Sequence, residues 1–107
     1  MGKLLYAGGT ASIEIDDRPL AHIRTVILAK LRRGESLAFT WESGTYGHPG
    51  KSTIWIHPAM PLQFDFYGSR EVALNRRWLD ELMASANTNS GMYVGAEPAA
   101  EASPEDA

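Results

Sequence analysis

The sequence predicts an α+β fold, a two-layer sandwich in which a mostly antiparallel sheet carries two helices on one face. Three observations support this class. Apolar and polar residues alternate in several short segments, which is typical of half-buried strands. Two longer segments repeat apolar residues at helical spacing. Short turns join consecutive strands, which favours antiparallel pairing. The expected order of elements is β-β-α-β-β-β-α-β.

The chain is predicted to begin with a β-hairpin. Residues 3–7 and 12–16 form its strands, and Gly8-Gly9-Thr10 between them is typical of a hairpin turn. In the second strand Ile13 and Ile15 alternate with polar residues. One face of this hairpin is therefore expected to lie on the core.

A helix is expected directly after the hairpin. Either Asp16 or Asp17 can cap it, and Pro19 suits its first turn, where no backbone donor is needed. Gly34 is a natural end of the helix. The apolar stripe of this helix comprises Leu20, Ile23, Ile27 and Leu31.

Ser52–Tyr67 carries the most distinctive pattern, because it contains two alternating strands joined by a segment with two prolines. A strand over 35–42 precedes it. A half-buried strand normally exposes small polar or charged groups, so Trp55 and Tyr67 on the outward face indicate a binding surface. The buried set of this register is Ile54, Ile56, Leu62, Phe64 and Phe66, and the outward set is Thr53, Trp55, His57, Gln63, Asp65 and Tyr67.

A second helix is expected to start at Ser69 as its cap and to end at Asn87. Residues 92–95 form a short last strand. Residues 97–107 lack any large apolar side chain, so we expect a disordered acidic tail after a single domain over 1–96. The buried stripe of the second helix comprises Val72, Trp78, Leu79, Leu82, Met83 and Ala86, with Asn75 among them.

Composition excludes several classes of protein. The chain has 107 residues, a net charge of −3 and no cysteine. It therefore has no disulfide, thiolate metal site or cysteine nucleophile, and it suits a reducing cytoplasm. The N-terminus does not resemble a signal peptide, and no apolar run approaches membrane-spanning length. We expect a cytoplasmic protein that has no membrane segment and needs no cofactor or metal.

Two features of the sequence suggest chemistry, a phosphate-loop-like segment and the histidines. The sequence His-Pro-Gly-Lys-Ser at 48–52 resembles the end of a phosphate loop, but the required first glycine would be at position 45, which is Thr45. The segment also precedes a strand instead of a helix. The histidines show no metal-ligand spacing. His57 with a nearby carboxylate remains the hypothesis for a small enzyme.

Basic residues support a nucleic-acid hypothesis. They cluster at the end of the first helix and near the second, on faces turned away from the apolar stripes. Such clusters either are solvated helix surfaces or contact a phosphate backbone. The candidate contacts are Arg32, Arg33, Arg76, Arg77 and Lys51.

Three segments resemble a family of short, uncharacterised bacterial proteins whose members often carry the automatic name "ATP-dependent DNA ligase". They are IEIDDRPLAHIRTVILAKLRRGESLAFTW, STIWIHPAMPLQFDFYGSR and NRRWLDELMASANTNSGM, and the resemblance covers residues 1–98. A ligase of that class needs Lys-x-Asp-Gly. Lys3, Lys30 and Lys51 are followed by Leu-Leu-Tyr, Leu-Arg-Arg and Ser-Thr-Ile. Ligase activity is therefore not supported, and the resemblance implies no catalytic residue.

Two functional hypotheses from different classes follow. The first is a non-catalytic interaction module that binds a protein partner, or a second copy of itself, through the outward face carrying Trp55, His57, Gln63, Asp65 and Tyr67. The second is a nucleic-acid-binding accessory protein associated with DNA ligation or repair, which uses the basic residues. Trp41 and Trp78 occupy apolar positions and are expected in the core.

Overall fold

A computed structural model describes residues 2–42 and 50–100, and it confirms the α+β class and the predicted order of elements. The expected loop residues 43–49 and the end of the tail, 101–107, lie outside the described residues. The elements are β1 (Gly2–Tyr6), the 3-10 turn η1 (Ala7–Gly9), β2 (Ala11–Ile15), α1 (Asp17–Arg32), β3 (Leu37–Glu42), β4 (Lys51–Ile56), β5 (Gln63–Asp65), α2 (Arg76–Ala86) and β6 (Met92–Tyr93).

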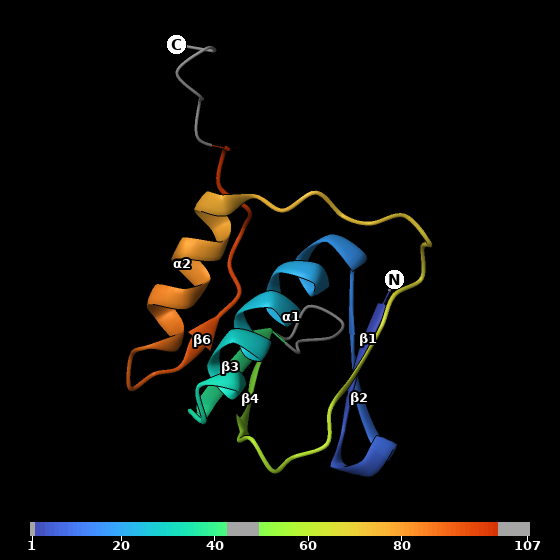
Figure 1. Cartoon of the computed structure of the whole chain (residues 1–107), viewed down its shortest axis with the longest axis vertical. Helices are drawn as coiled ribbons and strands as arrows, with labels where there is room; N and C mark the ends of the chain where they lie inside the picture. The colour runs from blue at the N-terminus through green and yellow to red at the C-terminus, as the bar shows by residue number, and fades with distance from the viewer. Residues whose placement is uncertain (1, 43–49, 101–107) are drawn as a thin grey trace.

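The strands form two three-stranded sheets, where the sequence had suggested one. Sheet A has the order β2-β1-β5, and sheet B has the order β4-β3-β6. Every pairing is antiparallel except that of β3 with β6. Figure 1 shows β1 and β2 on one side of α1 and β3, β4 and β6 on the other.

The strands β4 and β5 follow each other in sequence but belong to different sheets. Ile56 at the end of β4 pairs with Leu37 of β3, whereas Phe64 of β5 pairs with Leu4 of β1. Pro58 and Pro61 lie in the connecting segment. Proline has no backbone N–H to donate, so this segment cannot continue a ladder and instead carries the chain from sheet B to sheet A.

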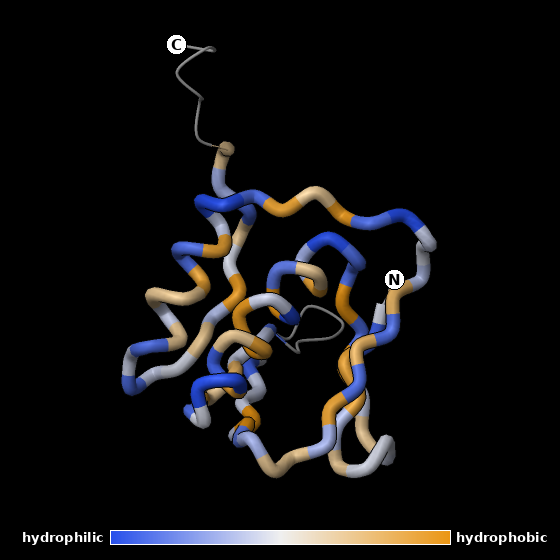
Figure 2. The backbone as a smooth tube through the Cα atoms, in the orientation of Figure 1, coloured by the Kyte–Doolittle hydropathy of each residue, from blue (hydrophilic) through white to orange (hydrophobic). Residues whose placement is uncertain are grey.

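The core forms where α1 and α2 pack against the sheets. The alternation predicted for residues 52–67 is confirmed, because Ile56 is fully buried and Ile54, Leu62, Phe64 and Phe66 are partly buried against the core. Trp78 is buried as predicted, and Trp41 packs partly buried against the same core. Figure 2 shows hydrophobic and hydrophilic residues alternating along the helices. The fully buried side chains include Leu4, Leu20, Ile23, Ile27, Phe39, Leu82 and Met92.

At the start of α1, the two candidate caps have different roles. Asp16 occupies the N-cap position but makes no side-chain capping bond. The Asp17 carboxylate accepts hydrogen bonds from the backbone amides of Tyr67 at 3.0 Å and Gly68 at 2.7 Å. These two bonds, first that of Gly68, lower the pKa of Asp17 below its ordinary value. Asp17 therefore fixes the chain leaving β5 against the start of α1.

The predicted start of the second helix was wrong. Helix α2 begins at Arg76 with Asn75 as its cap, and the Asn75 Oδ1 accepts hydrogen bonds from the amides of Arg77 at 3.1 Å and Trp78 at 3.4 Å. The backbone of Asn75 is extended, with φ −90° and ψ 105°. Residues 68–75, which include the expected cap Ser69 and the stripe residue Val72, form no helix and cross the end of α1 as an extended segment (Figure 1).

The first two residues of the expected tail contact the domain. Glu97 was predicted to be the first disordered residue, but its carboxylate bonds to Arg18 and Asn75. The Pro98 carbonyl accepts a hydrogen bond from the Asn75 side chain at 2.9 Å. A carboxylate and a carbonyl have thus ordered these two residues without any large apolar side chain.

Candidate functional site

The open face of sheet B, the face turned away from the buried core residues, carries aromatic, small polar and charged side chains. The strand register places Thr40 between Thr53 on β4 and Tyr93 on β6. The hydroxyls of Thr40 and Thr53 form a hydrogen bond of 2.7 Å. This middle row of the face is therefore held in place by a direct cross-strand contact.

One end of this face is closed by paired polar groups. The Tyr93 hydroxyl donates a hydrogen bond to Glu42 Oε1 at 2.9 Å, and this bond raises the pKa of Tyr93 above its ordinary value. The ammonium of Lys51 lies 5.0 Å from the centre of the Tyr93 ring, in cation–π geometry. One acidic and one basic side chain thus flank the same aromatic ring.

Trp55 dominates the other end of the face. Its side chain is 62% exposed, although large aromatic side chains are usually buried. Its cross-strand neighbour is Ala38, which is also approached by Gly91. A Cβ at Gly91 would lie 2.5 Å from the Ala38 Cβ, so this close packing requires glycine. The small side chain of Ala38 opposite Trp55 can cover little of the indole.

His57 follows β4 on the outward side of the same alternation, and it is exposed. Its Nδ1 accepts a hydrogen bond from the backbone amide of Ala59 at 3.3 Å, and its carbonyl accepts one from the amide of Met60 at 3.0 Å. Both contacts stabilise the turn that leaves sheet B. They give the imidazole a local structural role at the rim of the face.

The remaining predicted residues lie on sheet A or just after it. The Gln63 side-chain amide donates to both oxygens of Asp65, at 2.9 and 3.1 Å. Tyr67 is 85% exposed, and its backbone amide donates to Asp17. All six outward residues are exposed as predicted, but they are divided between two sheets that do not share a ladder.

A shallow pocket lies next to the sheet A group. It has a volume of about 240 Å³ and is formed between the η1 turn and the segment that enters β5. Gln63 is the one member of the predicted set that lines it. The other lining residues are Leu5, Gly8, Gly9, Pro61 and Leu62.

The four arginines of the nucleic-acid hypothesis lie at opposite ends of the helical layer, and its fifth residue, Lys51, lies on sheet B. Lys30, near Arg32 and Arg33, donates to Asn87 at the C-terminal end of α2 at 2.7 Å. Arg76 and Arg77 instead lie in the first turn of α2, next to Asn75, which contacts His22. Since α2 has 11 residues, about 16 Å separates the two ends. Lys30 itself is buried and ion-paired with Glu35 at 3.2 Å.

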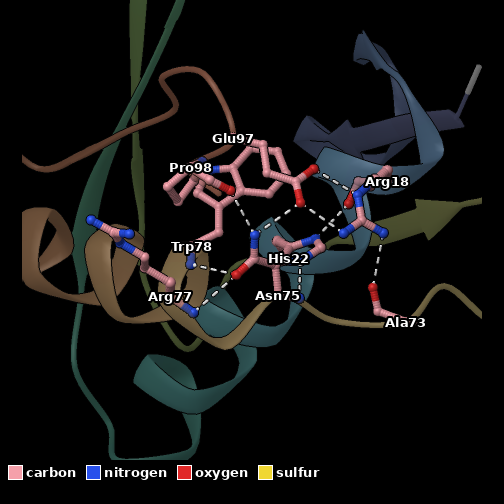
Figure 3. Close-up of polar contacts among 8 residues, drawn as sticks. All are labelled: Arg18, His22, Ala73, Asn75, Arg77, Trp78, Glu97 and Pro98. Atoms are coloured by element: carbon pink, nitrogen blue, oxygen red, sulfur yellow. Dashed lines mark hydrogen bonds and ion pairs between the residues drawn. The ribbon is translucent and has the colours of Figure 1, made fainter. Parts of the chain in front are cut away.

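A buried polar cluster was not anticipated from the sequence. His22 is fully buried, and its Nδ1–H donates to the Arg18 carbonyl at 2.7 Å while its Nε2 accepts from the Asn75 amide at 2.8 Å (Figure 3). A carbonyl can only accept and an amide can only donate, so these partners select the Nδ1–H tautomer. The imidazole also lies 4.6 Å from the Trp78 ring.

The same cluster binds the end of the domain, and we call its residues, Arg18, His22, Asn75 and Glu97, the clasp. Arg18 donates to both Glu97 oxygens, at 2.6 and 2.7 Å, and to the Ala73 carbonyl at 2.9 Å (Figure 3). Asn75 donates to Glu97 at 2.9 Å. These bonds, first those of Arg18, lower the pKa of Glu97 from 4.5 to about 2. The clasp joins three distant segments, and its hydrogen-bonding groups are used internally.

Comparison with protein families matches residues 1–97 to a domain of unknown function, DUF7882. The chain belongs to the DUF7882 family. The match ends at Glu97, the residue whose carboxylate completes the clasp, so the DUF7882 domain includes the clasp. The comparisons with curated proteins and with solved structures found no match.

Within residues 2–42 and 50–100, no helix combines the length and the apolar character that crossing a bilayer requires.

Proposed function

We propose that this DUF7882 domain is a non-catalytic, cytoplasmic interaction module that binds a protein partner through the open face of sheet B. The observation that carries the proposal is the 62% exposure of Trp55 on an ordered sheet face. Tryptophan is among the residues that contribute most to protein–protein binding energy, chiefly when it becomes buried at the centre of an interface.

The gain from covering this side chain is large. A buried aromatic side chain removes about 150–250 Å² from water. With 62% of the side chain exposed, roughly 120 Å² remains to be buried. At about 25 cal/mol per Å², that burial contributes about 3 kcal/mol. This lies within the range of hot-spot residues, which cost about 2 kcal/mol or more when truncated.

The surroundings of Trp55 lower the cost of binding. The Thr40–Thr53 and Tyr93–Glu42 hydrogen bonds hold the neighbouring side chains in one arrangement before a partner arrives. Fewer rotamers are then lost on association. A protein–protein interface usually combines apolar area with paired polar groups at its rim, and this face offers both, Trp55 at one end and the Tyr93–Glu42 pair at the other.

The alternative of a nucleic-acid-binding accessory protein has less support. A phosphate backbone is best held by a continuous basic surface. Arg32 and Arg33 lie at one end of the helical layer and Arg76 and Arg77 at the other. The acidic residues Asp80 and Glu81 lie between them on α2 and are exposed.

The test is differential capture with point variants. Tagged wild-type chain, Trp55→Ala and Tyr67→Ala serve as baits in lysate from cells that naturally make the protein, and captured proteins are identified by mass spectrometry. Tyr67→Ala is the matched control because it removes an aromatic residue that is even more exposed, at 85%, from the segment that follows sheet A. We expect a partner held by wild type and Tyr67→Ala but lost with Trp55→Ala. If Trp55→Ala captures the same proteins as the wild-type chain, the proposal is contradicted.

A further inference from the structure

We propose that His22 is a pH-sensitive contact, in which the neutral imidazole holds the start of α2 against α1 and the protonated imidazole releases it. The basis is the pair of hydrogen-bond partners that this buried ring has. His22 belongs to α1 and not to the open face of sheet B, so this proposal and the proposed function can fail separately.

Both ring nitrogens of His22 have partners, and the two partners differ in polarity. Nδ1–H donates to the Arg18 carbonyl at 2.7 Å, and Nε2 accepts from the Asn75 amide at 2.8 Å (Figure 3). An imidazolium carries a proton on each nitrogen and can accept no hydrogen bond. Its second proton, on Nε2, would point at the N–H of Asn75. Protonation of the ring and the bond from the Asn75 amide therefore exclude each other.

The charged groups around the ring act in opposite directions. The Arg18 guanidinium disfavours a second positive charge, whereas the Glu97 carboxylate bound to it favours one. From α2, the Trp78 ring lies 4.6 Å away and also favours a cation, while the Arg77 side chain points away from the imidazole (Figure 3). His22 is fully buried, so water does not solvate a charge on it in the closed arrangement. The partner of Nε2 therefore separates the two states of the ring.

Loss of this contact acts on the start of α2. Asn75 is the N-cap of that helix, and its Oδ1 accepts hydrogen bonds from the amides of Arg77 and Trp78. The other end of the extended segment 68–75 is attached to α1 separately, because the Asp17 carboxylate accepts a hydrogen bond from the Gly68 amide at 2.7 Å. Protonation of His22 would thus loosen the α2 end of this segment and leave its sheet A end attached.

The direction of the pH effect follows from the number of protons bound. The open state binds one more proton than the closed state, so acid favours opening. Below the pH at which the released ring gains its proton, the open fraction rises about tenfold for each further pH unit. Histidine ordinarily changes charge between about pH 5 and 8. The pKa of Glu97 is lowered to about 2, so the ion pair of the clasp persists through that interval.

Amide hydrogen exchange of the full chain, followed by NMR from about pH 7.5 to about pH 5, tests the proposal. After correction for intrinsic exchange rates, protection of the Asn75 amide should fall with pH, approaching about tenfold per pH unit at the acid end. The Gly68 amide is the internal control, since its acceptor Asp17 has a lowered pKa and stays ionised. Its protection should remain constant. Constant protection of the Asn75 amide over the same interval overturns the proposal.

Two histidine variants separate proton binding from packing. His22→Gln keeps a donor and an acceptor but takes up no proton in this interval, so the protection of its Asn75 amide should not depend on pH. His57→Gln removes an exposed imidazole after β4 and should retain the wild-type dependence. Wild-type dependence in His22→Gln, or its loss in His57→Gln, contradicts the role given to His22. If His22→Gln does not fold, the wild-type comparison of Asn75 with Gly68 still decides the question.

Discussion

Removing the Asn75 side chain should destabilise the domain, because this one side chain joins the start of α2 to the C-terminal segment. This side chain caps α2 through Oδ1 and holds the C-terminal segment through Nδ2, which donates to Glu97 and Pro98. It is 6% exposed, so water cannot replace these bonds in the folded chain. Asn75→Ala removes all of them together.

The expected magnitude can be built up bond by bond. Loss of an N-cap costs about 1 kcal/mol. Loss of the hydrogen bond to the Pro98 carbonyl costs about 1 kcal/mol more. The free energy of unfolding should therefore fall by at least about 2 kcal/mol, before the bond to Glu97 is counted. For a domain of this size, that corresponds to a decrease in melting temperature of about 8–16 °C.

Urea denaturation followed by circular dichroism measures this loss as a shift in midpoint at constant slope. Asn75→Ser is the matched variant, since serine can still cap the helix but is too short to reach Glu97 and Pro98. We expect it to retain the capping contribution and lose the rest, so that its stability falls between those of wild type and Asn75→Ala. An Asn75→Ala chain within about 0.5 kcal/mol of wild type refutes the reasoning, since that is the range of ordinary surface substitutions.

Two further predictions concern the clasp and β6. The lowered pKa of Glu97 means that its stabilising contribution is complete above pH 4.5 and is lost as the pH falls toward about 2. The difference in urea midpoint between wild type and Glu97→Gln should therefore shrink as the pH falls from 4.5 toward about 2. A difference that stays constant over this pH range would contradict the prediction. Gly91→Ala should lower stability by more than about 1 kcal/mol, because φ is +84° and the new Cβ would lie 2.5 Å from Ala38. Gly95→Ala is its control, since a Cβ there contacts nothing within 4 Å, and equal effects at both glycines would disprove the argument.

Local patterns predicted the parts of this fold that depend on near neighbours in the sequence. The bounds of α1 follow from a proline in the first turn and a glycine after the last turn. The outward position of Trp55 follows from the two-residue period of a strand, which holds whichever strand β4 pairs with. For the same reason, every member of the outward set was placed on the exposed side.

The start of α2 depended on a distant contact. Ser69 is an acceptable cap by type, but the His22 Nε2, 53 residues from Asn75 in sequence, holds the Asn75 amide and places the cap there instead. No pattern within residues 69–87 contains that information. The position of Asn75 within an otherwise apolar stripe was the one local sign of a special role.

The sequence alone determined the fold class, the order of the elements and the face on which each side chain lies, since these follow from short-range periodicity and capping. Tertiary structure alone decided that the strands divide into two sheets, that Trp55 lies apart from Gln63, Asp65 and Tyr67, and that Glu97 belongs to the domain. The reason is that strand partners and ion pairs are chosen by contacts between residues as far apart as Arg18 and Glu97, 79 positions along the chain. Such contacts form only when the helices and strands pack together, so no short stretch of sequence contains them.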